Sequence, residues 1–256
     1  MPSTIEQVAD RAMDLALSLL HRDDDGERVY KTDRDFATVT DFAIEDAVRE
    51  FLAHETPDTG FLGEERGHTG DRKTFWCLDP VDGTTNFTRS VPNYGVSLAL
   101  IEHGASTLGT IALPRSRRAI REPQRHRLPQ RSADPRFQDG QSARRPGLDR
   151  RLRNGNRKWC QERSTPSMIG SLAGAVGRVR MLGSAATDLA WLAAGRLDAV
   201  VIDANRMWDV AGGIAIARAA GAVVTHVDGS DYTLDGPPDV LATAPAIHGR
   251  IVDLLS

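Results

Sequence analysis

The sequence has few cysteines and no long apolar run. Only Cys77 and Cys160 occur among 256 residues, so no disulfide framework is expected, and a reducing cytoplasm fits. The first residues lack a basic-then-apolar signal segment, and no apolar stretch approaches the ~20 residues of a membrane span. The sequence therefore predicts a cytoplasmic protein that does not interact with membranes.

The charge of the chain is also low. The formal net charge is −3, so the whole molecule has no strong attraction for nucleic acid, and nucleic-acid binding is not expected. Hydrophobic residues make up 40% and charged residues 26%, which is ordinary for a globular protein. The length suffices for one large domain or two half-domains with substantial cores.

One long segment differs from the rest in composition. Residues 115–158 hold 14 arginines against four acidic residues, with scattered Pro, Gln and Gly and almost no apolar periodicity. The segment carries about +11 and leaves about −14 on the remainder. It could bind a polyanion, but it lacks the interleaved aromatic residues that stack on bases. A disordered surface loop is the simpler interpretation.

Elsewhere the patterns predict an α/β (α+β) fold with a mixed sheet between helix layers. Helices are expected at 3–21, capped by Ser3 with Glu6, and at 41–55, capped by Asp41. Further strands are expected at 75–79, 94–101, 107–113, 197–202, 222–225 and 239–243. Three more helices are expected: one after Gly183, one that begins near Met207, and one at 245–255. Asp209 is expected at the N-terminus of the helix near Met207.

The stretch from Trp76 to Phe87 carries the main chemical signal. Asp79 ends a predicted strand, and a turn through Pro80 brings Asp82 toward it before a helix begins near Thr84. Two carboxylates crowded at one strand end favour a bound cation, and the new helix offers N–H groups to an anion. The alternative is an Asp-rich turn in which Asp82 only caps the helix.

Three other pieces join this stretch. The four motifs are Gly63-Glu64-Glu65, Asp79-Pro80-Val81-Asp82-Gly83-Thr84-Thr85-Asn86, Gly183-Ser184-Ala185-Ala186 and Trp208-Asp209-Val210-Ala211-Gly212. In this order they resemble the inositol monophosphatase family, the Mg²⁺-dependent, lithium-sensitive sugar phosphatases related to fructose-1,6-bisphosphatase and the bisphosphate nucleotidases. The resemblance covers residues 1–113 and about 165–256.

The resemblance implies a layered α/β/α/β/α sandwich, usually a homodimer. Residues 1–113 would form an α+β half with the metal site, residues 114–164 the atypical segment, and residues 165–256 an α/β half that completes the site. Two to three Mg²⁺ ions are implied. Their ligands by resemblance are Glu64, Asp79 and the Val81 carbonyl for the first ion, Asp79, Asp82 and Asp209 for the second, and Glu64 for a loosely held third.

The same resemblance assigns catalytic and substrate-binding roles. An attacking water activated by metal would be oriented by Glu64, Thr84 and Asp41, with Asp82 beside it. Phosphate would rest on the N–H groups of Gly83 and Thr84. The implied substrate-binding set is Glu64, Val81, Asp82, Gly83, Thr84, Gly183, Ser184, Ala185 and Asp209.

The substrate is less well defined than the chemistry. Inositol monophosphate is the first candidate, but many animal members place a glutamate six residues before the Trp-Asp pair, where this chain has Ile202 followed by Asp203. Histidinol phosphate, fructose-1,6-bisphosphate and 3′-phosphoadenosine 5′-phosphate remain alternatives, as does a role in a specialised biosynthetic pathway. An alternative of another class is an inactive, phosphatase-like protein that binds polyanions through its arginine-rich segment.

The family normally has strands where this chain has residues 115–158. Replacement of those strands by Arg/Pro/Gln-rich sequence, with normal overall length and a later return of the family pattern, is what a shifted reading frame in GC-rich DNA would give. A shifted reading frame over this segment is therefore a hypothesis, and sequencing the coding region would test it. An uninterrupted, confirmed frame would reject the hypothesis.

Overall fold

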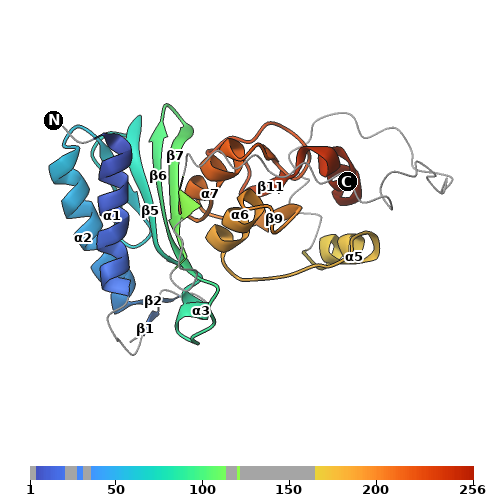
Figure 1. Ribbon diagram of the computed structural model, residues 1–256, viewed down its shortest axis with the longest axis horizontal. Helices are drawn as coiled ribbons and strands as arrows, with labels where there is room; N and C mark the ends of the chain where they lie inside the picture. Colours follow the sequence, from blue (N-terminus) through green and yellow to red (C-terminus); the bar gives the residue numbers. More distant parts are fainter. Residues whose placement is uncertain (1–3, 21–27, 31–35, 114–119, 122–164) are drawn as a thin grey trace.

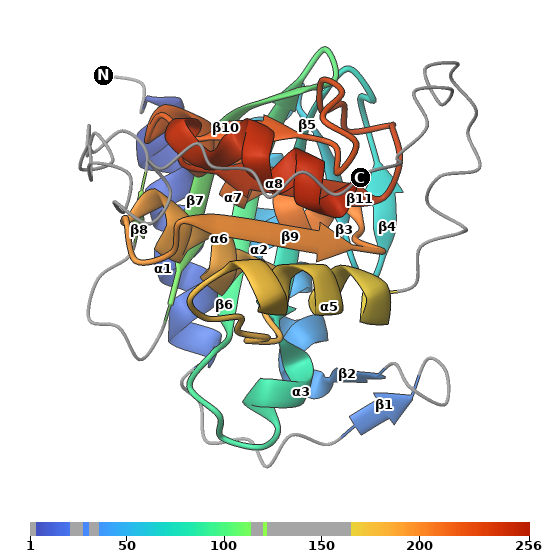
Figure 2. The same ribbon diagram turned by 90° about the vertical axis from the view of Figure 1, so that its right-hand side faces the viewer.

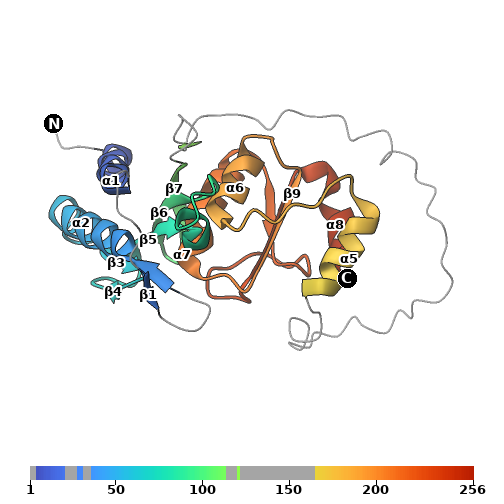
Figure 3. The same ribbon diagram turned by 90° about the horizontal axis from the view of Figure 1, so that it is seen from below.

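The helices and strands stack in five layers. The computed structural model describes residues 4–20, 28–30, 36–113, 120–121 and 165–256. Figure 1 shows, from left to right, a helix pair, a large sheet, a second helix pair, a small sheet and a third helix pair. The α/β/α/β/α sandwich expected from the sequence is therefore confirmed, and Figure 3 shows the same succession from below.

The large sheet has six strands in the order β4-β3-β5-β6-β7-β8. β3 and β5 run parallel, and the other neighbours are antiparallel. The strands are β3 (Gly60–Gly63), β4 (Gly67–Thr69), β5 (Thr74–Asp82), β6 (Gly95–Glu102), β7 (Ala105–Ala112) and β8 (Ile120–Arg121). A tight turn joins β6 to β7, and His103 is exposed in it. The short strands β3 and β4 were not expected as such.

Helices α1 (Ile5–Leu20) and α2 (Val39–Glu55) cover the outer face of this sheet. The apolar face of α1 packs with Trp76 and Leu98 of the central strands in one buried cluster. At the start of α1, the Thr4 side chain accepts a hydrogen bond from the N–H of Gln7 at 3.3 Å, and the Thr4 N–H donates to Gln7 Oε1 at 2.9 Å. The predicted cap, Ser3, lies outside the described residues.

The N-terminus of α2 also differs from expectation. Thr38 is its N-cap, and Asp41 occupies the third helical position, where its side chain accepts from the N–H of Thr38 at 2.8 Å. Both residue types accept backbone N–H groups near a helix start, so sequence alone placed the cap three residues late. Asp41 is fully buried as a result.

The middle helix layer contains α6 (Ala185–Ala193) and α7 (Met207–Ala219). One side of α7 contacts β5, β6 and β7, and another contacts β10, so every residue from Val210 to Ala217 is buried. Its small residues allow a close approach to the sheet. A Cβ on Gly109 of β7 would lie 2.2 Å from the carbonyl oxygen of Gly212.

The small sheet has the order β10-β11-β9, all antiparallel, with β9 (Ala199–Asp203), β10 (Val223–Thr225) and β11 (Asp239–Thr243). Helices α5 (Thr165–Ala175) and α8 (His248–Leu255), with the 3-10 turn η2 (Pro245–Ile247), cover its outer face, as Figure 2 shows. The predicted helix at 245–255 thus begins as a tighter turn, and α5 was not expected.

A two-stranded hairpin, β1 (Arg28–Tyr30) and β2 (Phe36–Thr38), leads into α2 and contacts α3 (Thr84–Phe87). Most of the atypical segment 114–164, including Cys160, lies outside the described residues, as do the proposed boundaries at 114 and 164. The helices that are described include none long and apolar enough to cross a membrane.

Adding a methyl group at Gly109 should destabilise the fold. The Gly109→Ala side chain would collide with the α7 backbone, and such overpacking typically costs about 1–3 kcal/mol. The control is Gly170→Ala on α5, where a Cβ meets no atom within 4 Å and a helix favours Ala over Gly. Urea unfolding should show a lower free energy of unfolding for Gly109→Ala only; equal values would contradict the packing.

Candidate active site

The strand β5 delivers both central carboxylates. It continues through Asp82 instead of ending at Asp79 as expected, with an irregular register against β6 between these residues. Pro80 lies within this irregularity, where the missing N–H of proline is tolerated. Asp79 and Asp82 are 2% and 7% exposed, so the strand places two acids inside the protein.

The turn after β5 depends on glycine. Gly83 has φ of +88°, and a Cβ there would lie 3.0 Å from the Asn93 carbonyl oxygen and 3.1 Å from that of Gly183. The short helix α3 then begins at Thr84 as predicted, and the Thr84 hydroxyl donates to the Val81 carbonyl at 3.0 Å. Residues 81–84 thus form one tight unit beside the turn that contains Gly183.

Asn86 joins this unit to the distant Gly183 turn. Its Nδ2 donates to the carbonyl oxygens of Asn93 and Leu182, both at 2.7 Å. Asp82 makes the second connection: its carboxylate accepts from the Ser184 hydroxyl and from the N–H groups of Ala185 at 3.2 Å and Ala186 at 2.8 Å. The structure therefore brings together two motifs that lie about one hundred residues apart in sequence.

The central carboxylates are difficult to ionise. Burial raises the pKa of Asp79 well above its usual range, and the negative charges of Asp82, Glu64, Asp209 and Asp41 raise it further. Burial likewise raises the pKa of Asp82 to about 7, although hydrogen bonds from Ser184 and the α6 N-terminus oppose this. Five predicted site carboxylates therefore affect one another electrostatically.

The outer members come from separate elements. Glu64 follows β3 and is half-buried, and Asp41 comes from the first turn of α2. Asp209 occupies the third position of α7, where its Oδ2 accepts from the Arg206 N–H at 2.5 Å, so Arg206 is the cap residue and Asp209 is not. The 183–185 turn lies against Asp82 through the contacts above.

These residues suit a hard divalent cation in kind, since they offer carboxylate oxygens and concentrated negative charge. Among the residues that the structure describes, no three His, Cys, Asp or Glu side chains converge as a metal site requires. Asp82 and Asp209 instead accept N–H groups at the starts of α6 and α7. Since an ionised carboxylate has about four acceptor sites, these hydrogen bonds are compatible with coordination by the same side chains.

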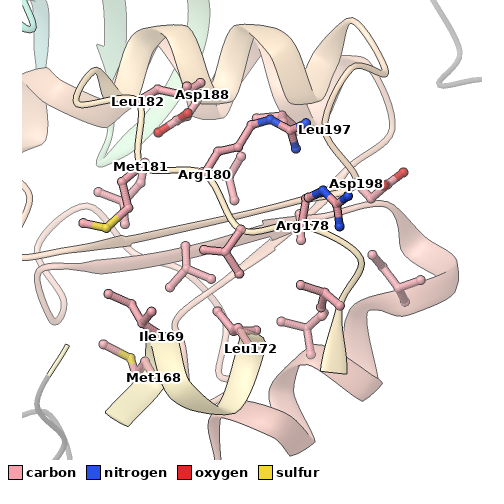
Figure 4. A pocket seen from close by; sticks show the side chains of 18 of the residues that line it. Met168, Ile169, Leu172, Arg178, Arg180, Met181, Leu182, Asp188, Leu197 and Asp198 are labelled. Atoms are coloured by element: carbon pink, nitrogen blue, oxygen red, sulfur yellow. The ribbon is translucent and has the colours of Figure 1, made fainter. Parts of the chain in front are cut away.

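A cavity of ≈ 1170 Å³ adjoins this site. It shares Gly183, Ser184 and Ala185 with it and extends between α5, β9 and α8 (Figure 4). Its lining is mostly apolar, with charged side chains among the apolar ones. The charged lining residues are Arg178, Arg180, Asp188, Arg196, Asp198, Asp203 and Arg250.

Sequence reasoning missed several residues here. Asn86 was quoted only as part of a motif, and its three-way connection depends on tertiary contacts that no local pattern encodes. Asp188 received no role, yet burial raises its pKa to about 7 beside the cavity. Glu45 was not singled out, yet it is a fully buried carboxylate that accepts from the N–H groups of Glu65 and Arg66.

The structure is thus a layered α/β protein in which the charges of several acidic side chains act on the buried Asp79. The Inositol monophosphatase family model matches residues 2–256, a range that encloses the arginine-rich segment. The chain belongs to the inositol monophosphatase family.

Individual relatives agree with this assignment. The chain is 31% identical to the "Inositol-1-monophosphatase" of Caulobacter vibrioides over 86% of its own length and 87% of the relative's. It is 33% identical to the "Nus factor SuhB" of Xylella fastidiosa over 79% and 73%. The crystal structure of extragenic suppressor protein suhB from Bartonella henselae matches with a TM-score of 0.78, 27% identity and 99% coverage of both chains.

The raised pKa of Asp188 predicts a pH dependence of stability. The folded protein keeps a proton that the unfolded chain loses near pH 3.8, so this residue's contribution is fully present below that pH and is lost as pH rises toward 7. Since one pKa unit corresponds to ~1.4 kcal/mol, the loss should reach a few kcal/mol. The substitution Asp188→Asn removes the titrating carboxyl group and with it this pH-dependent loss of stability.

Urea unfolding of both proteins in EDTA at pH 5 and pH 8 provides the measurement. The free energy of unfolding of Asp188→Asn, relative to that of the unsubstituted protein, should be higher at pH 8 than at pH 5. Parallel pH dependences would contradict the assignment.

Proposed function

We propose that this protein is a Mg²⁺-dependent phosphomonoesterase that hydrolyses a small sugar or cyclitol phosphate, with inositol monophosphate as the first candidate. The observation that carries the proposal is the buried pair Asp79 and Asp82, whose pKa values are raised by burial and by neighbouring carboxylates. Crowded buried carboxylates are costly in isolation and favourable around a cation. Family membership supplies independent support.

Phosphate-monoester hydrolysis is very slow without a catalyst, and bound Mg²⁺ would supply charge neutralisation and an acidified water. Glu64, Asp79, Asp82, Asp209 and the Val81 carbonyl would hold the ions. In the structure the Val81 carbonyl oxygen accepts a hydrogen bond from the Thr84 hydroxyl, which holds the carbonyl and the hydroxyl next to each other.

Other residues of the chain would orient the reactants. Thr84 and Glu64 would align the attacking water, with Asp41 behind them, and the N–H groups of Gly83 and Thr84 would bind phosphate oxygens. The leaving group would contact the 183–185 turn and extend into the adjoining cavity. A homodimer is part of the proposal by family resemblance alone.

The proposal predicts phosphate release from at least one of four esters: inositol monophosphate, fructose-1,6-bisphosphate, 3′-phosphoadenosine 5′-phosphate and histidinol phosphate. Release should require Mg²⁺ and be inhibited by Li⁺. Colorimetric phosphate detection with and without each ion provides the measurement. Absence of Mg²⁺-dependent release from all four, by protein shown to be folded, would contradict the proposal.

The matched variants are Asp82→Asn and Asp46→Asn. The first neutralises a proposed metal ligand and should lower kcat by more than the ~10–100-fold typical of losing a residue that only supports a ligand. Asp46 is an exposed carboxylate on α2 that pairs with Arg66, and its replacement should leave kcat unchanged. Thermal unfolding of both variants separates a loss of chemistry from a loss of fold.

A further inference from the structure

Glu45 is a fully buried carboxylate that the proposed chemistry does not use. It projects from α2, one helical turn after Asp41, toward the turn that follows β3. Its Oε2 accepts from the N–H of Glu65 at 2.7 Å, and its Oε1 accepts from the N–H of Arg66 at 2.9 Å. The two backbone groups immediately after Glu64 are therefore bound by one side chain.

Gly63, the residue before Glu64, packs directly against the Glu45 carboxylate. A Cβ on Gly63 would lie 2.2 Å from Glu45 Cδ and 2.3 and 2.5 Å from its two oxygens. The carboxylate thus occupies the space that any side chain at position 63 would need. Glu64 is held between a glycine in contact with Glu45 and two N–H groups bonded to Glu45.

The charge of Glu45 is compensated locally. Arg49, four residues later on α2, donates to Glu45 Oε1 at 2.6 Å. The same guanidinium donates to the Gly67 carbonyl at 3.0 Å and to Thr69 Oγ1 at 2.8 Å, and it lies 4.4 Å from the centre of the Phe61 ring. The ion pair and the two N–H donors give this buried carboxylate well-defined hydrogen-bond partners, and charge-assisted hydrogen bonds are stronger than neutral ones.

We propose that Glu45 is a positioning residue that fixes the Glu64 backbone so that the Glu64 carboxylate faces Asp79. Strands β3 and β5 run parallel with Gly63 paired to Leu78, so Glu64 and Asp79 are the next residues of two adjacent strands. The inference rests on the proposed function, in which Glu64 is a ligand of Mg²⁺. Helix α2 then contributes to the site twice, through Asp41 directly and through Glu45 by way of the turn.

The test compares Glu45→Gln with Asp46→Asn. Glu45→Gln keeps the shape of the side chain but presents an amide N–H₂ to donor groups, so the 64–66 turn should shift. Asp46→Asn also removes one carboxylate of α2 that binds this turn, but Asp46 contacts only the exposed Arg66 guanidinium there, at 3.1 and 2.9 Å.

Calorimetric titration with Mg²⁺ supplies a measurement independent of turnover. It is made at a temperature where circular dichroism shows each variant fully folded. The Mg²⁺ affinity should fall by about 10–100-fold in Glu45→Gln, as for residues that orient metal ligands, and should not change in Asp46→Asn. A merely structural role would lower the melting temperature of Glu45→Gln without changing the affinity of the folded protein.

The outcomes separate this inference from the proposed function. Wild-type affinity in folded Glu45→Gln would overturn the positioning role alone, as would an equal loss in Asp46→Asn. Absence of Mg²⁺ binding by the unsubstituted protein would overturn both proposals. If Glu45→Gln does not fold, the Mg²⁺ titration is made on Glu45→Asp. That variant keeps a carboxylate, but its side chain is one methylene shorter and holds the carboxylate farther from the 64–66 turn. Wild-type affinity in that variant would also overturn the inference.

Discussion

The structure around β5 depends on one constraint, which is that several carboxylates must be accommodated close to the protein interior. Asp79 and Asp82 are buried at one end of β5, and the charges of Glu64, Asp209 and Asp41 act on them. Mutual repulsion and burial both oppose ionisation, which the raised pKa values express. Each surrounding element either donates hydrogen bonds to one of these carboxylates or contributes a further carboxylate that acts on Asp79.

Helix N-termini provide much of this stabilisation. Asp41 lies at the third position of α2, Asp209 at the third position of α7, and Asp82 accepts N–H groups from the start of α6. The positive end of a helix dipole stabilises a carboxylate by about 0.3–1 kcal/mol, and by up to ~2 kcal/mol in partly buried geometries. A pKa of about 7 for Asp82 persists despite this help, so the helix ends offset the crowding only in part. A divalent cation would supply the larger compensation that the proposed function requires.

Sequence patterns predicted several elements of the layers, whereas the order of the layers was implied by the family resemblance. The apolar runs of β6 and β7 and the apolar face of α1 are local signals, and all three elements were confirmed. The errors cluster where tertiary contacts decide. β5 continues past Pro80 because a register irregularity accommodates it, and Thr38 caps α2 because Asp41 bonds back to it. Glu45 and Asn86 have roles only through partners that are distant in sequence, which no local pattern contains.

The cavity next to the site differs in chemistry from the carboxylates proposed to bind metal, because most of its lining is apolar. At the spacing where the family resemblance led us to look for a glutamate, this chain has Ile202, which lines the cavity together with Leu182 and Leu197. An apolar lining discriminates weakly between substrates that differ by one hydroxyl group, because it leaves no buried polar partner unpaired when the hydroxyl is missing. Under the proposed function, the carboxylates at the end of β5 would determine the reaction, and the cavity lining beyond the 183–185 turn would determine which substrates bind. Since that lining offers mainly apolar surface with charged groups of both signs, its selectivity should come from size and charge more than from the number of ring hydroxyls.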